Sequence, residues 1–134
     1  GARFVRDQAS AYRRPDGLLT HWCDTSEAAA RAVGAHDPAQ RVATQEQVMT
    51  VCSLERTLVL EAVVHHLDCL LELPSAPRPG VGPSAVARET FSALAGTELP
   101  EGEQWLLRAA GRLRLTDHDR SLLGAAADRF PLLA

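Results

Sequence analysis

The sequence contains little of what marks several common classes of protein. All fourteen basic residues are arginine, no segment gathers them into a basic cluster, and the net charge is −3 with a pI near 5.9. These values argue against a nucleic-acid-binding surface. No run approaches the ~18 consecutive apolar residues that a bilayer span requires, and the first residues do not resemble a signal peptide. We therefore expect neither a nucleic-acid nor a membrane partner.

Cysteine is scarce as well. Cys23, Cys52 and Cys69 are an odd number without a CxxC spacing, a pattern that indicates neither a disulfide framework nor a zinc finger. A reducing cytoplasm fits this usage best. Base rates for free cysteine predict that all three are small buried hydrophobic residues. Cys69 follows His65 by four residues, so an approach to a metal bound beside His65 stays open as the alternative.

Aromatic residues make up only 4% of the chain, β-branched residues are few, and Ala, Leu, Arg and Glu dominate. No stretch alternates at period two, so the composition predicts an all-α fold. A length of 134 residues with 46% hydrophobic residues suits one compact core. We expect a single helical domain over 1–134, with a bundle portion at 1–73, a Pro/Gly linker at 74–83 and C-terminal helices at 84–134.

Turn and cap residues divide the chain into helices. Gly34, Pro74 and Gly96 are placed to end helices, whereas Ser84 and Thr116 are placed to cap the start of helices. Residues 34–49 are expected to form a polar connection, and Trp22 and Trp105 are expected to anchor the core. The predicted helices cover 3–13, 17–33, 50–73, 84–95, 100–111 and 116–130.

The most apolar run of the chain contains a carboxylate and an imidazole. Residues 61–68 read Glu-Ala-Val-Val-His-His-Leu-Asp, which places Glu61 and His65 on one face of a helix, one turn apart. Apolar residues surround both, so we expect this helix in the interior. Even an uncharged polar group costs roughly 2 to 7 kcal/mol to bury without a partner. Such a pair is ordinarily a surface or core polar pair, and a metal site is the alternative.

Two neighbouring residues could support that pair. His66 leaves the helix about 100° from His65, so both cannot bind one metal comfortably. We interpret His66 as a packing residue or as a support for the ligands. Asp68 could orient the imidazole of His65 or form an ion pair with an arginine of a neighbouring helix, and we favour the ion pair.

Residues 48–68, VMTVCSLERTLVLEAVVHHLD, resemble the actinobacterial mycothiol-dependent maleylpyruvate isomerase-like proteins, which belong to the DinB-like metal-binding helical bundles. The family pattern "mTv.dl..tR..E.vVH..Dl" has metal ligands at its Glu and at the His four residues later, positions that match Glu61 and His65. Residues 109–124 and the closing Arg-Phe-Pro-Leu-Leu are also similar to C-terminal segments of family members. The resemblance thus covers roughly residues 40–134.

The resemblance implies part of a DinB-like four-helix bundle followed by C-terminal helices. It implies a divalent metal, usually zinc, and the thiol cofactor mycothiol, which together transform a small electrophilic substrate by isomerisation or S-transfer. The family's third ligand is a His in a first-helix segment resembling "GWtVrdllaHl", which this sequence does not contain. His21 is the open alternative for that ligand, and the sequence assigns no catalytic residue.

The missing segment leads to an expectation about assembly. A chain without the first bundle helix would expose an apolar groove along 54–71, and large exposed apolar patches usually find a partner. We therefore expect a homodimer or association with a missing N-terminal segment. A second hypothesis, from a different class, is a non-catalytic helical module for binding or assembly that has lost its metal site.

Overall fold

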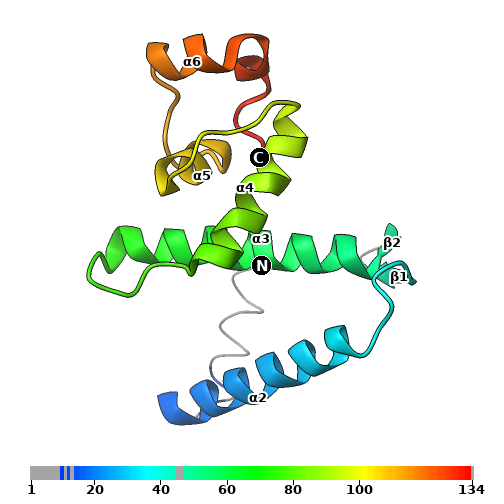
Figure 1. The fold of residues 1–134 in the computed structure, drawn as a ribbon. Coiled ribbons are helices and arrows are strands. Elements are labelled where there is room, and N and C mark those ends of the chain that lie inside the picture. The colour runs from blue at the N-terminus through cyan, green and yellow to red at the C-terminus, as the bar shows by residue number, and fades with distance from the viewer. Residues whose placement is uncertain (1–9, 11, 13, 45–46, 134) are drawn as a thin grey trace. The chain divides into compact units, whose positions relative to one another are not determined.

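The computed structural model describes residues 10, 12, 14–44 and 47–133 (Figure 1). The chain divides into two compact units between Val51 and Cys52. The fold is predominantly helical, which confirms the predicted all-α class. The helix predicted over 3–13 falls almost entirely outside the described residues. The elements in chain order are α2 (Pro15–Gly34), β1 (Arg41–Thr44), β2 (Gln47–Thr50), α3 (Val51–Glu72), α4 (Val81–Ala95), α5 (Glu103–Ala109), α6 (Asp117–Leu123) and the 3₁₀ helix η1 (Gly124–Arg129).

Helix α2 dominates the described part of the N-terminal unit. Pro15 suits the first helical position because its fixed φ is already helical, and Asp16 complements the helix dipole in the first turn. The helix ends at Gly34, where the sequence predicted its stop. No residue of α2 is buried, and Trp22 is 69% exposed. The core role predicted for Trp22 is therefore wrong.

A short hairpin follows α2 and corrects the predicted polar connection. Strands β1 and β2 pair antiparallel with Arg41 opposite Thr50 and Thr44 opposite Gln47. One further backbone hydrogen bond follows the paired strands, from the Val51 amide to the Gln40 carbonyl at 2.8 Å. Each strand has four residues and so only two side chains per face, too few for period-two alternation to be visible in the sequence.

Helix α3 supplies one wall of the core in the C-terminal unit. Its buried side chains recur at helical spacing and form one apolar stripe, which packs with Phe91 of α4 and with Leu106 of α5. Because these elements cover the stripe, the predicted apolar groove along 54–71 is wrong; among its larger side chains Leu58 and Leu71 stay exposed, nearly four turns apart. The buried stripe consists of Leu60, Val63, Val64, Leu67 and Leu70.

The linker after α3 is shorter than predicted. Helix α4 begins at Val81 with Gly80 as its N-cap, so residues 81–83 of the predicted linker are helical and Ser84 is not the cap. Pro83 does not prevent this, since amides in the first helical turn need no partner within the helix. At the other end Gly96 adopts a left-handed φ of 71° and closes the helix, as predicted.

Helices α5 and α6 are joined by a buried ion pair. The Arg108 Nε of α5 donates to Asp119 Oδ2 of α6 at 2.7 Å, with side-chain exposures of 13% and 7%. The same Asp119 oxygen accepts from the backbone amide and the hydroxyl of Thr116. The Asp119 amide donates in return to the Thr116 hydroxyl oxygen, which completes a capping box and confirms Thr116 as the cap. The predicted helix over 116–130 nevertheless changes at Gly124 into the 3₁₀ helix η1.

The chain after η1 returns to the helices before it. Arg129 Nη1 donates to the Ala95 carbonyl at the end of α4, and the Leu132 amide donates to the Ala109 carbonyl at the end of α5, both at 2.8 Å. These bonds satisfy carbonyls that a helix end leaves without partners. The C-terminal segment that resembles the family therefore has a packing role here. Across the described ranges, no helix combines the length and hydropathy of a membrane span.

Candidate functional site

Glu61 and His65 lie one turn apart on α3, and their side chains converge. Nε2 of His65 is 3.5 Å from Oε2 of Glu61, close to the roughly 3.4 Å that separates two ligands placed about 2.1 Å from a tetrahedral zinc. The predicted interior position is wrong, because the side chains are 69% and 52% exposed. Only one face of α3 is buried, and this pair lies outside it.

Asp68 lies close to the imidazole of His65 and also forms an ion pair with an arginine, the two arrangements that the sequence left open. Its Oδ2 lies 3.6 Å from Nδ1 of His65, on the opposite edge of the ring from Glu61. Its two oxygens also accept from Nε and Nη2 of Arg112, both at 2.8 Å. The bonds from Arg112 hold the pKa of the Asp68 carboxyl below its ordinary value. Asp68 is therefore ionised at neutral pH and faces the imidazole.

The other candidate residues have contacts of their own. Nε2 of His66 is 2.8 Å from the Pro77 carbonyl, so His66 contacts the segment that follows α3. Cys69 is exposed, as are Cys23 and Cys52, and the burial predicted for all three is wrong. His21 lies on α2 in the N-terminal unit, with its ring 5.8 Å from that of Tyr12.

Glu61 and His65 supply the kinds of donor atom that a divalent metal binds. A carboxylate oxygen and an imidazole nitrogen at 3.5 Å fit two positions of a tetrahedral site, and a carboxylate behind Nδ1 is the usual support of a metal-bound histidine. Within the ranges that the structure describes, no group of three His, Cys, Asp or Glu side chains is placed to hold an ion. The two donors fit a metal, and the third ligand is not found among the described residues.

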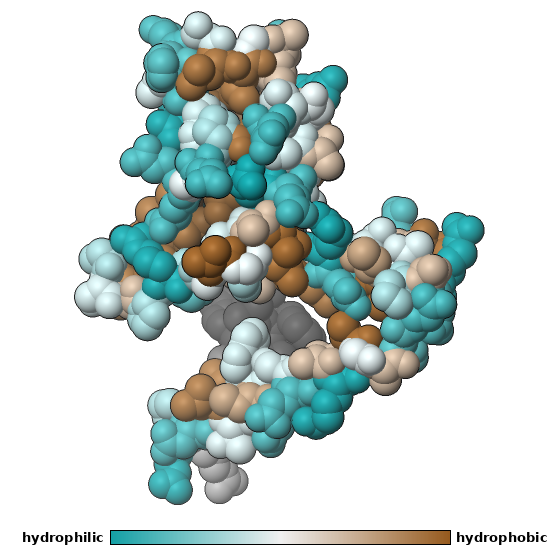
Figure 2. Space-filling view, in the orientation of Figure 1, coloured by the Kyte–Doolittle hydropathy of each residue, from teal (hydrophilic) through white to brown (hydrophobic). Residues whose placement is uncertain are grey.

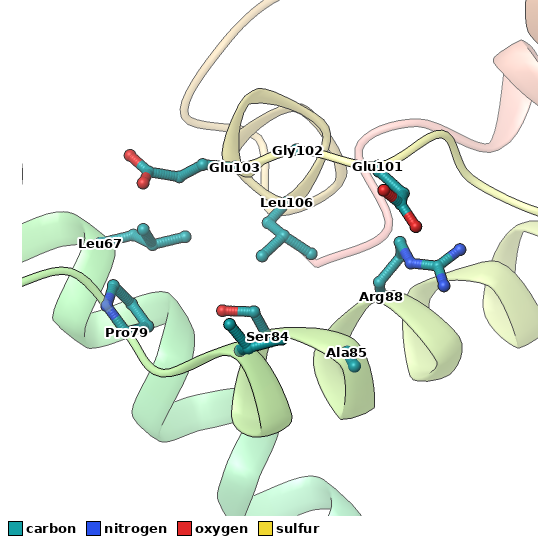
Figure 3. A pocket seen from close by; sticks show the side chains of 10 residues that line it. Leu67, Pro79, Ser84, Ala85, Arg88, Glu101, Gly102, Glu103 and Leu106 are labelled. Atoms are coloured by element: carbon teal, nitrogen blue, oxygen red, sulfur yellow. The ribbon is translucent and has the colours of Figure 1, made fainter.

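Sequence reasoning missed a cavity of about 290 Å³ in the C-terminal unit (Figure 3). Leu67 and Leu106 form apolar walls, and Arg88 and Glu101 lie together at one end. Arg88 is held in place by the Glu98 carboxylate and the Leu99 carbonyl. Leu67 leaves α3 about 200° from His65, so the cavity opens on the other side of the helix. The cavity residues are spread over four segments, which explains why no sequence motif marks them.

Residues 5–69 match the family model described as the mycothiol maleylpyruvate isomerase N-terminal domain. The match includes the Glu61–Asp68 segment and begins well before residue 40, where the motif-based resemblance began. No curated protein and no solved structure matches the chain. Residues 5–69 are therefore similar to the mycothiol maleylpyruvate isomerase N-terminal domain, the family that the motif around Glu61 and His65 indicated.

Proposed function

We propose that the chain is part of a metal-dependent enzyme that uses mycothiol as a thiol cofactor. The observation that carries the proposal is the 3.5 Å approach of His65 Nε2 to Glu61 Oε2, inside the segment that matches the family. An imidazole and a carboxylate are donors that zinc accepts. The proposed compartment is the cytoplasm, where free cysteines stay reduced.

Each residue of the site has a distinct task in this proposal. Glu61 and His65 hold the ion from consecutive turns of α3, and Asp68 orients the ring of His65 through Nδ1. His66 fixes the segment after α3 through the Pro77 carbonyl. When bound, a divalent metal, zinc in the first instance, would lower the pKa of a coordinated thiol so that a thiolate forms at neutral pH and attacks an electrophilic carbon.

The reaction class follows from the fate of that thiolate. Addition to a conjugated double bond, rotation and elimination return the thiol unchanged, which is an isomerisation. Displacement of a leaving group keeps the new carbon–sulfur bond and consumes one thiol for each product, which is S-transfer. Both reactions begin with the same attack, so the site supports a small electrophilic substrate of either kind.

A direct test uses the chain with Zn²⁺, mycothiol and maleylpyruvate. We expect zinc to bind at one equivalent by isothermal titration, and the loaded chain to speed the reaction of maleylpyruvate with mycothiol over the chelator-treated chain. A constant thiol concentration during turnover assigns an isomerase; loss of one thiol per product assigns an S-transferase. Absence of zinc binding would reject the metal-dependent proposal.

A second candidate function is a non-catalytic helical module for binding or assembly. The observation that favours it is that no three-ligand group occurs in the part of the chain that the structure describes. Exposure of Glu61 and His65 also suits an ordinary helix-surface pair. This alternative predicts no zinc stoichiometry and no thiol chemistry, together with a stable complex in solution.

Assembly is a further proposal, with a homodimer as the expected state. Leu18, Leu19 and Trp22 are exposed apolar side chains at neighbouring positions of α2. Figure 2 shows apolar surface on this helix beside hydrophilic side chains. Exposed tryptophans are enriched among the residues that dominate interfaces. We expect light scattering to give a dimer mass, and Trp22→Ser to weaken dimerisation by roughly 30-fold. Val81→Ser, at an exposed position of α4, is the control that should not change the mass. A monomer of the unmodified chain at high concentration would refute the proposal.

A further inference from the structure

We propose that a cavity of the C-terminal unit binds a small, doubly charged organic anion that carries an apolar body. The cavity has a volume of about 320 Å³, at the small end of the roughly 300 to 1,000 Å³ that is usual for ligand sites. Its lining comes from the end of α5, the connection to α6, α6 itself and the chain after η1. None of these described lining residues belongs to α3 or to residues 5–69, so the inference goes beyond the proposed metal site and does not depend on it.

The cavity carries an excess of positive charge. Arg108, Arg114 and Arg120 line it, and none of its described lining residues is acidic. Asp119 neutralises Arg108 through the bond of 2.7 Å between Oδ2 and Nε. Among the residues that the structure describes, the side chains of Arg114 and Arg120 have no ion-pair or hydrogen-bond partner. Two positive charges are therefore left to a ligand, in a chain whose net charge is −3.

The two guanidinium groups determine the head group of the ligand. A guanidinium stays charged at any physiological pH and presents pairs of N–H donors that match the oxygens of a carboxylate or a phosphate. A single carboxylate would neutralise only one of Arg114 and Arg120. A phosphate ester or a pair of neighbouring carboxylates would neutralise both, which is why the proposed anion is doubly charged.

The remaining walls of the cavity determine the body of the ligand. Leu113, Leu115 and Phe130 line it with apolar side chains. Leu113 is 41% exposed, so it has apolar surface that a ligand can still cover. Removal of that surface from water favours an aromatic or aliphatic body over a purely inorganic ion.

Backbone contacts hold the two sides of the cavity together before any ligand arrives. Gly111 has a φ of 78°, and a Cβ at this position would lie 3.0 Å from Cβ of Pro131, so the absence of a side chain lets the two segments approach. The Leu132 amide donates to the Ala109 carbonyl at 2.8 Å beside this contact. A site whose walls are already fixed loses little conformational freedom when it binds a ligand.

The experiment titrates the whole metal-free chain with phenyl phosphate and with phthalate, followed by isothermal titration calorimetry at low salt. The two probes share one aromatic ring and differ in the head group, so the tighter one identifies a phosphate or a dicarboxylate as the preferred head. We expect saturable binding at one equivalent for at least one of them. Inorganic phosphate, which lacks the ring, and benzoate, which carries a single charge, should each bind at least about 10-fold more weakly.

Variants separate this site from a general attraction of anions. Arg114→Met and Arg120→Met should each weaken the tighter probe by at least about 10-fold. Leu113→Ser should weaken it by about 3 to 10-fold. Arg56→Met is the matched control, because it removes the same charge from α3, away from the cavity lining, and should leave the affinity unchanged. Circular dichroism of each variant checks that the fold is intact.

Four results would overturn the inference. They are no saturable binding of either probe at millimolar concentrations, equal affinity for benzoate, an unchanged affinity in both Arg114→Met and Arg120→Met, and an equal loss in Arg56→Met.

Discussion

Replacement of Glu61 or His65 by alanine is expected to abolish zinc binding. The two side chains place an imidazole nitrogen and a carboxylate oxygen at ligand spacing, 3.5 Å apart. A protein zinc site needs three or four protein ligands to compete with water, so loss of either leaves too few. Isothermal titration of each variant with Zn²⁺ measures this, with urea unfolding in parallel to show that the exposed substitutions leave the fold intact.

The neighbouring residues provide graded controls. His66→Ala should lose no more than about 10 to 100-fold in affinity, since His66 contacts the Pro77 carbonyl and points about 100° from His65. Glu72→Ala removes an exposed carboxylate from the end of the same helix and should have no effect. His21→Ala tests the remaining alternative for a third ligand. Equal losses for His65 and His66, or none for Glu61, would remove the basis for the site.

Asp119→Ala is expected to destabilise the C-terminal unit by about 3 to 5 kcal/mol. The substitution leaves the Arg108 guanidinium buried without its partner and removes the oxygen that closes the capping box with Thr116. Unfolding in urea, followed by circular dichroism, measures the free energy. Asp117→Ala is the matched control, because it removes an exposed acid from the same helical turn and should cost less than about 1 kcal/mol. Similar losses for both would contradict the buried-pair explanation.

The lowered pKa of Asp119 also leads to an expectation of how the free energy of unfolding depends on pH. Burial alone would raise the pKa of its carboxyl, but the hydrogen bonds from Thr116 and the charge of Arg108 outweigh burial and lower the pKa. Because the folded pKa is below the unfolded value near 3.8, this stabilisation is complete above that value and is lost as pH falls through the folded pKa. Asp119→Asn should flatten the acid limb of the stability curve. An unchanged limb would show that other carboxyls govern it.

Helix ends were predictable from single residues because caps act locally. Gly96 can adopt a positive φ that other residues resist, and Thr116 with Asp119 satisfies amides of its own helix. The predictions failed where a local rule has exceptions. Pro83 is tolerated in the first turn of α4, and the four-residue strands β1 and β2 are held by a backbone ladder that leaves little pattern in the sequence.

Burial was the least predictable property. The sequence around Glu61 is apolar on all sides, yet α4 and α5 cover only the stripe that contains Leu60, Val63 and Leu67. Trp22 and the three cysteines are exposed as well, because residue type gives only an average preference for burial and does not say which element will cover a side chain.

The amino-acid sequence by itself determined the helical class, the spacing of Glu61 and His65 and the similarity to the family, because helical periodicity and a short motif are properties of neighbouring residues. Only the tertiary structure decided that Glu61 and His65 face outward and that Arg112 binds Asp68, which is 44 residues away in the sequence. Contacts between distant segments arise when apolar faces pack together, and local patterns do not specify which faces meet.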